Sequence, residues 1–71
     1  MYYNGGNSGV ASIIGRLAPG SPVYVWFDHS GFVSTYFQFC AGHFAAFSGG
    51  GFDGGLTYIE INKIQAIRVG H

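Results

Sequence analysis

The stretch from Leu56 to Val69 constrains the fold of this chain more than any other part. Its sequence is LTYIEINKIQAIRV. Ile59 and Ile61 are two residues apart, as are Ile67 and Val69, and this is the spacing of side chains on one face of a β-strand. Between these pairs the alternation breaks, because one continuous strand would have to bury a lysine and a glutamine.

The break in alternation predicts a change of chain direction. Ile61, Ile64 and Ile67 are three residues apart, and side chains at that spacing lie on one side of a tight helical turn. We therefore predict two short strands joined by a helical turn over residues 62–65. Asn62 suits the corner because its amide can bond its own backbone. Both strands then direct their isoleucines into one core.

The N-terminal part of the chain predicts an arm and a short helix. Residues 1–9 (MYYNGGNSG) are rich in glycine and asparagine, so we expect a flexible arm there. The apolar residues that follow have helical spacing: Val10, Ile13, Ile14 and Leu17. This spacing predicts a helix with Ser8 as its N-cap, ended by Pro19 and Gly20.

Three segments of alternating β-branched and aromatic residues come next. They are Pro22–Asp28, Phe32–Cys40 and His43–Ser48. Turns are expected over residues 28–31 and 41–42, and a glycine loop over residues 49–55. Together with the two strands of the final stretch, they predict an all-β fold with one N-terminal helix. We expect a single domain over residues 10–71, built as a small, strongly bent five-stranded barrel.

The composition predicts self-association. Charged residues make up 8% of the 71 residues and aromatic residues 18%, and the net charge is zero. Ordinary soluble domains have about 25% charged residues. A core of this size supplies only about 3–5 kcal/mol of net stability, and the single cysteine, Cys40, excludes an internal disulfide. Because a neutral surface repels its copies weakly, we expect a homo-oligomer.

The strands carry more large apolar side chains than one small barrel can enclose. The expected inner set is Val23, Val25, Phe27, Val33, Phe37, Phe39, Ile59, Ile61, Ile67 and Val69, and the expected outer set is Tyr24, Trp26, Phe32, Tyr36 and Tyr58. A contiguous exposed apolar patch marks an interface, and the edges of the last two strands can pair with another chain. The predicted interface between copies consists of Tyr24, Trp26, Tyr36, Tyr58, Ile67 and Val69. In the alternative arrangement, the helix and the glycine loop cover these side chains within one chain.

Three segments resemble the Sm-like (LSm) family of small β-barrels. They are the apolar helix stripe over residues 10–17, Gly31-Phe32-Val33 at the start of the second strand, and residues 58–64 with Ile67. The layout is similar to that of small Sm-like proteins of spore-forming bacteria. The resemblance implies a short helix on a bent five-stranded barrel over residues 8–69, and a tendency to form rings.

The resemblance also defines where RNA would bind, and the chain departs from the family there. The RNA-binding loop of Sm proteins carries an acidic residue and an asparagine, and its counterpart here is Ala41-Gly42-His43. Asn62-Lys63 stands where the second Sm motif has Arg-Gly. The alternative to a structural role is therefore an RNA-binding ring. In that ring, RNA or another anion would contact His43, Lys63 and Arg68.

The main hypothesis is a non-enzymatic structural or scaffold protein that forms a homo-oligomeric ring, tube or filament. No catalytic residues, metal or cofactor are expected. A weaker alternative is a small metal- or ligand-binding module on Cys40 and His43, which would need two further ligands for zinc. No apolar run approaches the length of about 18 residues that spans a bilayer. The N-terminus does not resemble a secretory signal, so we expect a cytoplasmic protein. The resemblance adds a spore or surface layer as a second location.

Overall fold

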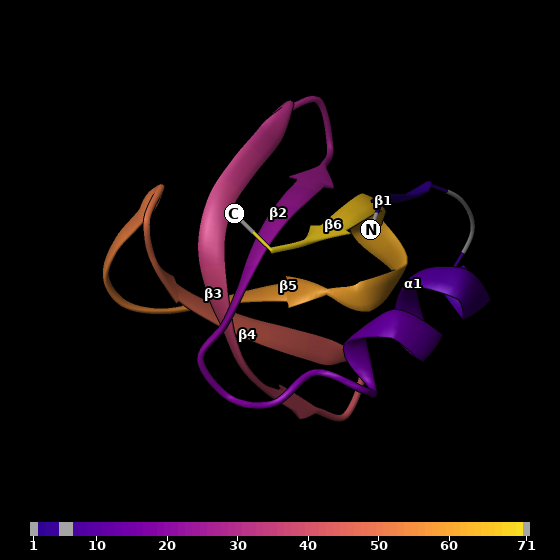
Figure 1. The fold of residues 1–71 in the computed structure, drawn as a ribbon, viewed down its shortest axis with the longest axis horizontal. Helices are drawn as coiled ribbons and strands as arrows, with labels where there is room; N and C mark the ends of the chain where they lie inside the picture. Colours follow the sequence, from indigo (N-terminus) through magenta and orange to yellow (C-terminus); the bar gives the residue numbers. More distant parts are fainter. Residues whose placement is uncertain (1, 5–6, 71) are drawn as a thin grey trace.

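The computed structural model describes residues 2–4 and 7–70, and the side chains of residues 9–70. It consists of one bent antiparallel sheet with a short helix at one end (Figure 1). In chain order the elements are β1 Tyr2–Asn4, α1 Asn7–Ile14, β2 Ser21–Phe27, β3 Phe32–Ala41, β4 Phe44–Gly49, β5 Phe52–Glu60, the 3₁₀ helix η1 Ile61–Lys63 and β6 Ile64–Val69. The order across the sheet is β1-β6-β2-β3-β4-β5.

The predicted fold class is confirmed. The chain is all-β with one short N-terminal helix, and β2 to β6 are the five strands that the sequence predicts. The predicted helical turn between the last two strands is η1, which begins one residue earlier than expected. The backbone N–H of Ile61 donates to the carbonyl oxygen of His43 at 2.8 Å, and this bond fixes η1 against the β3–β4 turn. Ile64 then enters the core almost completely buried.

The N-terminal part differs from the prediction of an arm over residues 1–9. Tyr2–Asn4 forms β1, which pairs with residues 66–68 of β6, and α1 begins at Asn7. The boundary predicted at residue 10 is therefore too late, and Ser8 lies inside the helix rather than at its N-cap. Residues 1, 5 and 6 of the predicted arm lie outside the described part of the chain.

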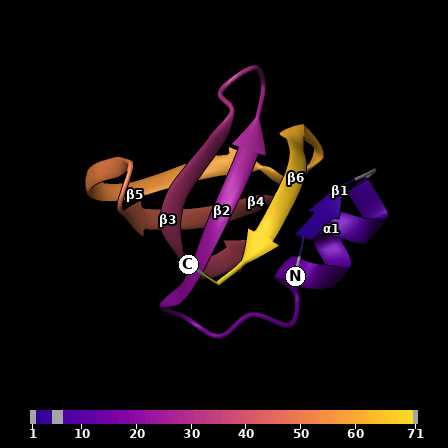
Figure 2. The ribbon, with the colours of Figure 1, turned by 45° about the horizontal axis from the view of Figure 1, so that its top comes forward.

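The sheet folds over itself to enclose the core, without closing into a complete barrel. β2 and β6 form one half, β4 and β5 form the other, and the long strand β3 belongs to both (Figure 2). β3 has a register shift between Phe37 and Phe39, where its pairing with β4 is irregular. Such a bulge bends a strand and increases its twist, which lets the two halves cross at a wide angle. β1 and β5 remain the two ends of the sheet.

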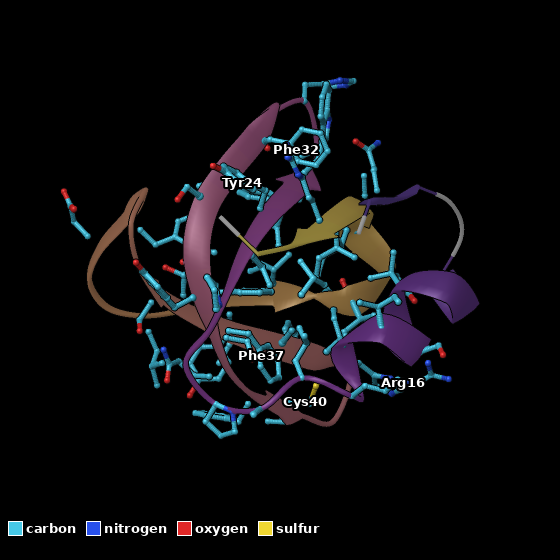
Figure 3. All side chains as sticks on the ribbon, in the orientation of Figure 1. Arg16, Tyr24, Phe32, Phe37 and Cys40 are labelled. Atoms are coloured by element: carbon cyan, nitrogen blue, oxygen red, sulfur yellow. The ribbon has the colours of Figure 1, made fainter. Side chains whose placement is uncertain are left out.

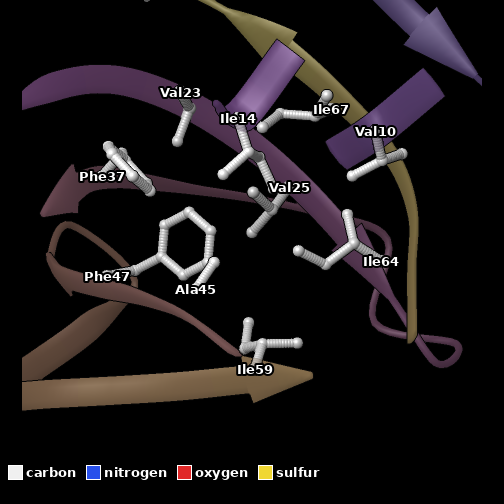
Figure 4. Close-up of a cluster of buried hydrophobic side chains, with 10 residues drawn as sticks. All are labelled: Val10, Ile14, Val23, Val25, Phe37, Ala45, Phe47, Ile59, Ile64 and Ile67. Carbon is white, nitrogen blue, oxygen red and sulfur yellow. The ribbon is translucent and has the colours of Figure 1, made fainter. Parts of the chain in front are cut away.

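The core lies between the two halves and is closed at one end by α1 (Figure 4). Its buried side chains are Val10, Ile14, Val23, Val25, Phe37, Ala45, Phe47, Ile59, Ile64 and Ile67. Thr35 is fully buried among them. Its hydroxyl lies 2.9 Å from the carbonyl oxygen of Gly49 and 3.1 Å from that of Ser48. This buried hydroxyl therefore has acceptors for its proton.

The glycine loop is shorter than predicted because β5 already begins at Phe52. The turn packs directly against the backbone of β3. Gly50 has a φ of +60°, and a Cβ atom at this position would overlap the carbonyl oxygen of Ser34. The N–H of Gly51 donates to the same oxygen at 2.6 Å. Only glycine fits this close approach, because it has no Cβ atom and readily adopts a positive φ.

Candidate interaction surface

Large apolar side chains are exposed on the outer face of the sheet, the face turned away from the core. Their exposed fractions are Trp26 37%, Phe32 38%, Tyr36 40%, Phe39 40%, Phe44 44%, Leu56 45% and Tyr58 52%. α1 does not cover them, because Val10 and Ile14 direct it into the core. The glycine turn does not cover them either, since Phe52 packs inward near Phe27 and Phe47.

The first group, which we call the Trp26 patch, lies over β2, β3 and β6. It consists of Tyr24, Trp26, Phe32 and Arg68. The ring of Phe32 meets that of Trp26 edge-on, with 5.2 Å between the ring centroids. It also meets the ring of Tyr24 edge-on, with 6.4 Å between the centroids, and Figure 3 shows Tyr24 and Phe32 on the same side of the sheet. The guanidinium carbon of Arg68 lies 5.4 Å from the centroid of Tyr24, in a cation–π contact. Cross-strand register explains the grouping, because Trp26 faces Phe32 and Tyr24 faces Arg68.

The second group, which we call the Tyr58 patch, lies over β4, β5 and the end of β3. It consists of Phe39, Phe44, Leu56, Tyr58 and Glu60. Phe39 and Tyr58 both lie opposite Ala46 on β4, and their rings meet edge-on at 6.0 Å. Ala46 is fully buried, although alternation along β4 directs its side chain away from the core. The two rings therefore cover Ala46 from the outer side.

Phe39 corrects one prediction. Continuous alternation along the second predicted strand places Phe39 in the core with Phe37. The bulge between these residues shifts the alternation, so Phe37 is 3% exposed and Phe39 is 40% exposed. Phe39 therefore belongs to the outer face and not to the core.

Four of the six predicted interface residues lie on the outer face. Tyr24 is half-buried, while Trp26, Tyr36 and Tyr58 are exposed. The assignment of Ile67 is wrong, because Ile67 faces Val25 across β2 and is fully buried in the core. Val69 faces Val23 and is half-buried on the same inner side, so its side chain does not belong to the outer face either.

The three residues predicted to contact RNA or another anion are divided between two places. His43 lies in the β3–β4 turn and Lys63 ends η1, and the bond from Ile61 to His43 joins these two elements. Arg68 instead belongs to the Trp26 patch, stacked on Tyr24. Of these three residues, only Arg68 therefore lies in the Trp26 patch, and the three do not form one cluster.

Cys40 lies beside a shallow apolar groove between β3 and the segment that follows α1. Ile14, Leu17, Pro19 and Phe37 line this groove with Cys40. Burial raises the pKa of the Cys40 thiol, which keeps it protonated and weakly nucleophilic near neutral pH. Within residues 2–4 and 7–70, no three His, Cys, Asp or Glu residues come together as a metal site would require.

No helix in the described part of the chain is both long and apolar enough to cross a membrane. Comparison with known proteins gives no match to a protein-family model, a curated protein or a solved structure. The Sm-like resemblance therefore stays a prediction, and function has to be inferred from the outer face of the sheet.

Proposed function

We propose that this protein is a non-enzymatic building block that assembles with copies of itself into a structural or scaffold particle. The observation that carries the proposal is the outer face of the sheet. Six large apolar side chains of the two patches are between 37% and 52% exposed there: Trp26, Phe32, Phe39, Phe44, Leu56 and Tyr58. Monomeric proteins seldom leave contiguous apolar patches of this kind uncovered, and such patches usually mark interfaces.

The residue types support an interface. Aromatic side chains and arginine are enriched at the centres of protein–protein contacts, where burial of apolar area stabilises the complex. The rings already pack against one another, as Trp26 does with Phe32 and Phe39 with Tyr58. They are therefore partly ordered before a partner arrives, which lowers the entropy lost on association.

The edges of the sheet offer a second way for copies to associate. The last strand, β6, was expected to offer such an edge, but it does not. β6 is paired on both sides, with β2 and with β1, so it cannot donate a free edge in this form. β5 pairs with β4, and no other described strand pairs with its second edge. Leu56 and Tyr58 lie on β5, so a partner on the Tyr58 patch would also lie beside this open edge.

Substitution of Trp26 tests the proposal. The wild-type protein is expected to scatter light as a particle several times heavier than the 7.6 kDa chain. Trp26→Asp places a charge in the contact, which should weaken association by about 30-fold or more, equivalent to at least about 2 kcal/mol. Asn62→Asp adds the same charge at an exposed position of η1 and should leave the particle intact.

Circular dichroism of each variant shows whether the subunit still folds. Tyr58→Asp provides a second variant, because the side chain is 52% exposed and contributes little to the core. A wild-type protein that scatters as a monomer at micromolar concentration, with native circular dichroism, would contradict the proposal.

The Trp26 patch also supports a second candidate function, the binding of single-stranded RNA. Exposed rings beside an arginine can stack bases. With Arg68 as its only cation, the patch would neutralise about one phosphate, so the salt dependence of log K should have a slope of about −0.7 per subunit. Titration of Trp26 fluorescence with uridine-rich or adenine-rich oligonucleotides tests this function, and an unchanged signal at micromolar RNA would exclude it.

A further inference from the structure

The two patches lie on opposite sides of the molecule. The halves of the sheet enclose the core between them, with β2 and β6 on one side and β4 and β5 on the other (Figure 2). The outer faces of two halves packed in this way point away from each other. The Trp26 patch and the Tyr58 patch can therefore each contact a different neighbour at the same time.

The two patches also carry opposite charges. Arg68 stacks on Tyr24 within the Trp26 patch. Glu60 ends β5 within the Tyr58 patch, opposite Phe44 in the β4–β5 ladder. Of the other charged side chains of residues 9–70, Arg16 and Asp28 lie in turns and Lys63 ends η1. Asp53 is exposed near the start of β5, at the opposite end of that strand from Glu60, and has the same sign. Each patch thus has one charged group next to its aromatic rings, and the two groups differ in sign.

From this arrangement we infer that copies join head to tail, with the Trp26 patch of one copy on the Tyr58 patch of the next and Arg68 facing Glu60. The inference rests on the proposed self-association and specifies its geometry. Arginine suits this place, because a guanidinium stacked on a ring still presents its in-plane N–H groups to a carboxylate.

The alternative is a symmetric contact between two identical patches. Such a contact would bury two Arg68 side chains, or two Glu60 side chains, without a partner of opposite charge. Removing a charge from water without a partner is unfavourable, and like charges across an interface repel. The head-to-tail contact avoids both costs. Because it is heterologous, it extends from copy to copy and gives a ring when the rotation closes and a filament when it does not.

Mixing two one-sided variants tests the geometry. Trp26→Asp removes one patch and Tyr58→Asp removes the other, so each variant alone is expected to be a monomer. In the mixture, the intact Trp26 patch of Tyr58→Asp binds the intact Tyr58 patch of Trp26→Asp. We expect a 1:1 dimer of twice the chain mass and nothing larger, as measured by light scattering or native mass spectrometry.

A symmetric contact predicts the opposite result. Each single variant would then form a homodimer through its remaining intact patch, and mixing would add nothing. Homodimers of the separate variants, or a mixture that stays monomeric while the wild-type protein assembles, would overturn the head-to-tail geometry. If the wild-type protein is itself monomeric, the proposed self-association is wrong. That result is distinct from the two above, which would overturn only the head-to-tail geometry.

Charge reversal within the 1:1 dimer tests the contact between Arg68 and Glu60. Arg68→Glu in the Tyr58→Asp chain, or Glu60→Lys in the Trp26→Asp chain, should raise the dissociation constant by about tenfold or more. Both reversals together should restore most of the affinity in isothermal titration calorimetry. An unchanged affinity after either reversal, or no recovery in the double reversal, would overturn the pairing.

The dimer also provides a matched control. Glu60→Lys in the Tyr58→Asp chain changes a glutamate on the patch that is already disabled and outside the contact. It should change the dissociation constant by no more than about twofold, as expected for a distant and independent site. A loss of affinity as large as that from Glu60→Lys in the Trp26→Asp chain would contradict the proposed head-to-tail contact.

Discussion

Phe47→Ala is expected to leave the chain largely unfolded at 25 °C. The side chain is fully buried between the two halves of the sheet, with ring centroids 6.0 Å from Phe37 and 6.4 Å from Phe52. Truncation of a buried phenylalanine to alanine costs about 3–5 kcal/mol. The core of a domain this small supplies only about that much net stability. Circular dichroism during urea unfolding should show little or no folded baseline.

Phe44→Ala is the matched control for this prediction. It makes the same substitution on the same strand, but Phe44 lies on the outer face and is 44% exposed. The free energy of unfolding of the subunit should fall by less than that of Phe47→Ala, by about 1 kcal/mol or less. Equal losses for the two variants would mean that the division into inner and outer faces is wrong.

Gly50→Ala is expected to have the second-largest effect. A Cβ atom at this position would overlap the carbonyl oxygen of Ser34, so the turn would have to move away from β3. That movement would break the 2.6 Å hydrogen bond from Gly51 to Ser34. The positive φ costs about 1–2 kcal/mol for alanine, and the lost hydrogen bond adds about 1–3 kcal/mol. Urea unfolding should therefore show a loss of about 3 kcal/mol.

Gly42→Ala separates the two causes. Gly42 has a φ of +59°, almost the same as Gly50, but a Cβ atom there would meet nothing within 4 Å. Only the backbone strain applies, so the loss should be about 1–2 kcal/mol. If Gly42→Ala destabilises the protein as much as Gly50→Ala, then contact between the turn and β3 does not explain the glycine at position 50.

Alternation along the strands explains why much of the fold could be predicted from the sequence. In β2, Val23 and Val25 are fully buried while Trp26 is exposed, as their period of two requires. The interruption of that period after Ile61 correctly predicted a helical turn between the last two strands, although η1 spans Ile61–Lys63 rather than residues 62–65. Both features depend on residues close together in the chain, so they can be recognised from the sequence alone.

The errors arose where pairing between distant strands decides the structure. The bulge that turns Phe39 outward depends on the register of β3 against β4, and no glycine or proline marks it in the sequence. β1 was predicted as part of an arm because its composition suggests disorder, yet it pairs with β6. Ile67 was assigned to an interface because β6 was expected at an edge of the sheet.

The Tyr58 patch was missed for the same reasons. Tyr58 alone was predicted to face outward from this half of the sheet, while Phe39 was placed in the core. The sequence assigns no face to Phe44 and Leu56, because the predicted strand boundaries lie next to them. Only the paired ladder of β3, β4 and β5 brings these side chains together around Ala46.

The most direct test of self-association uses the single tryptophan of the chain, Trp26. Its side chain is 37% exposed in one subunit and lies at the centre of a proposed contact. As the protein concentration rises, its fluorescence emission should shift to the blue and acrylamide quenching should fall. Both changes should occur over the concentrations at which the scattering mass rises above that of one chain. Emission and quenching that do not change with concentration, in a protein that remains a monomer, would contradict the account.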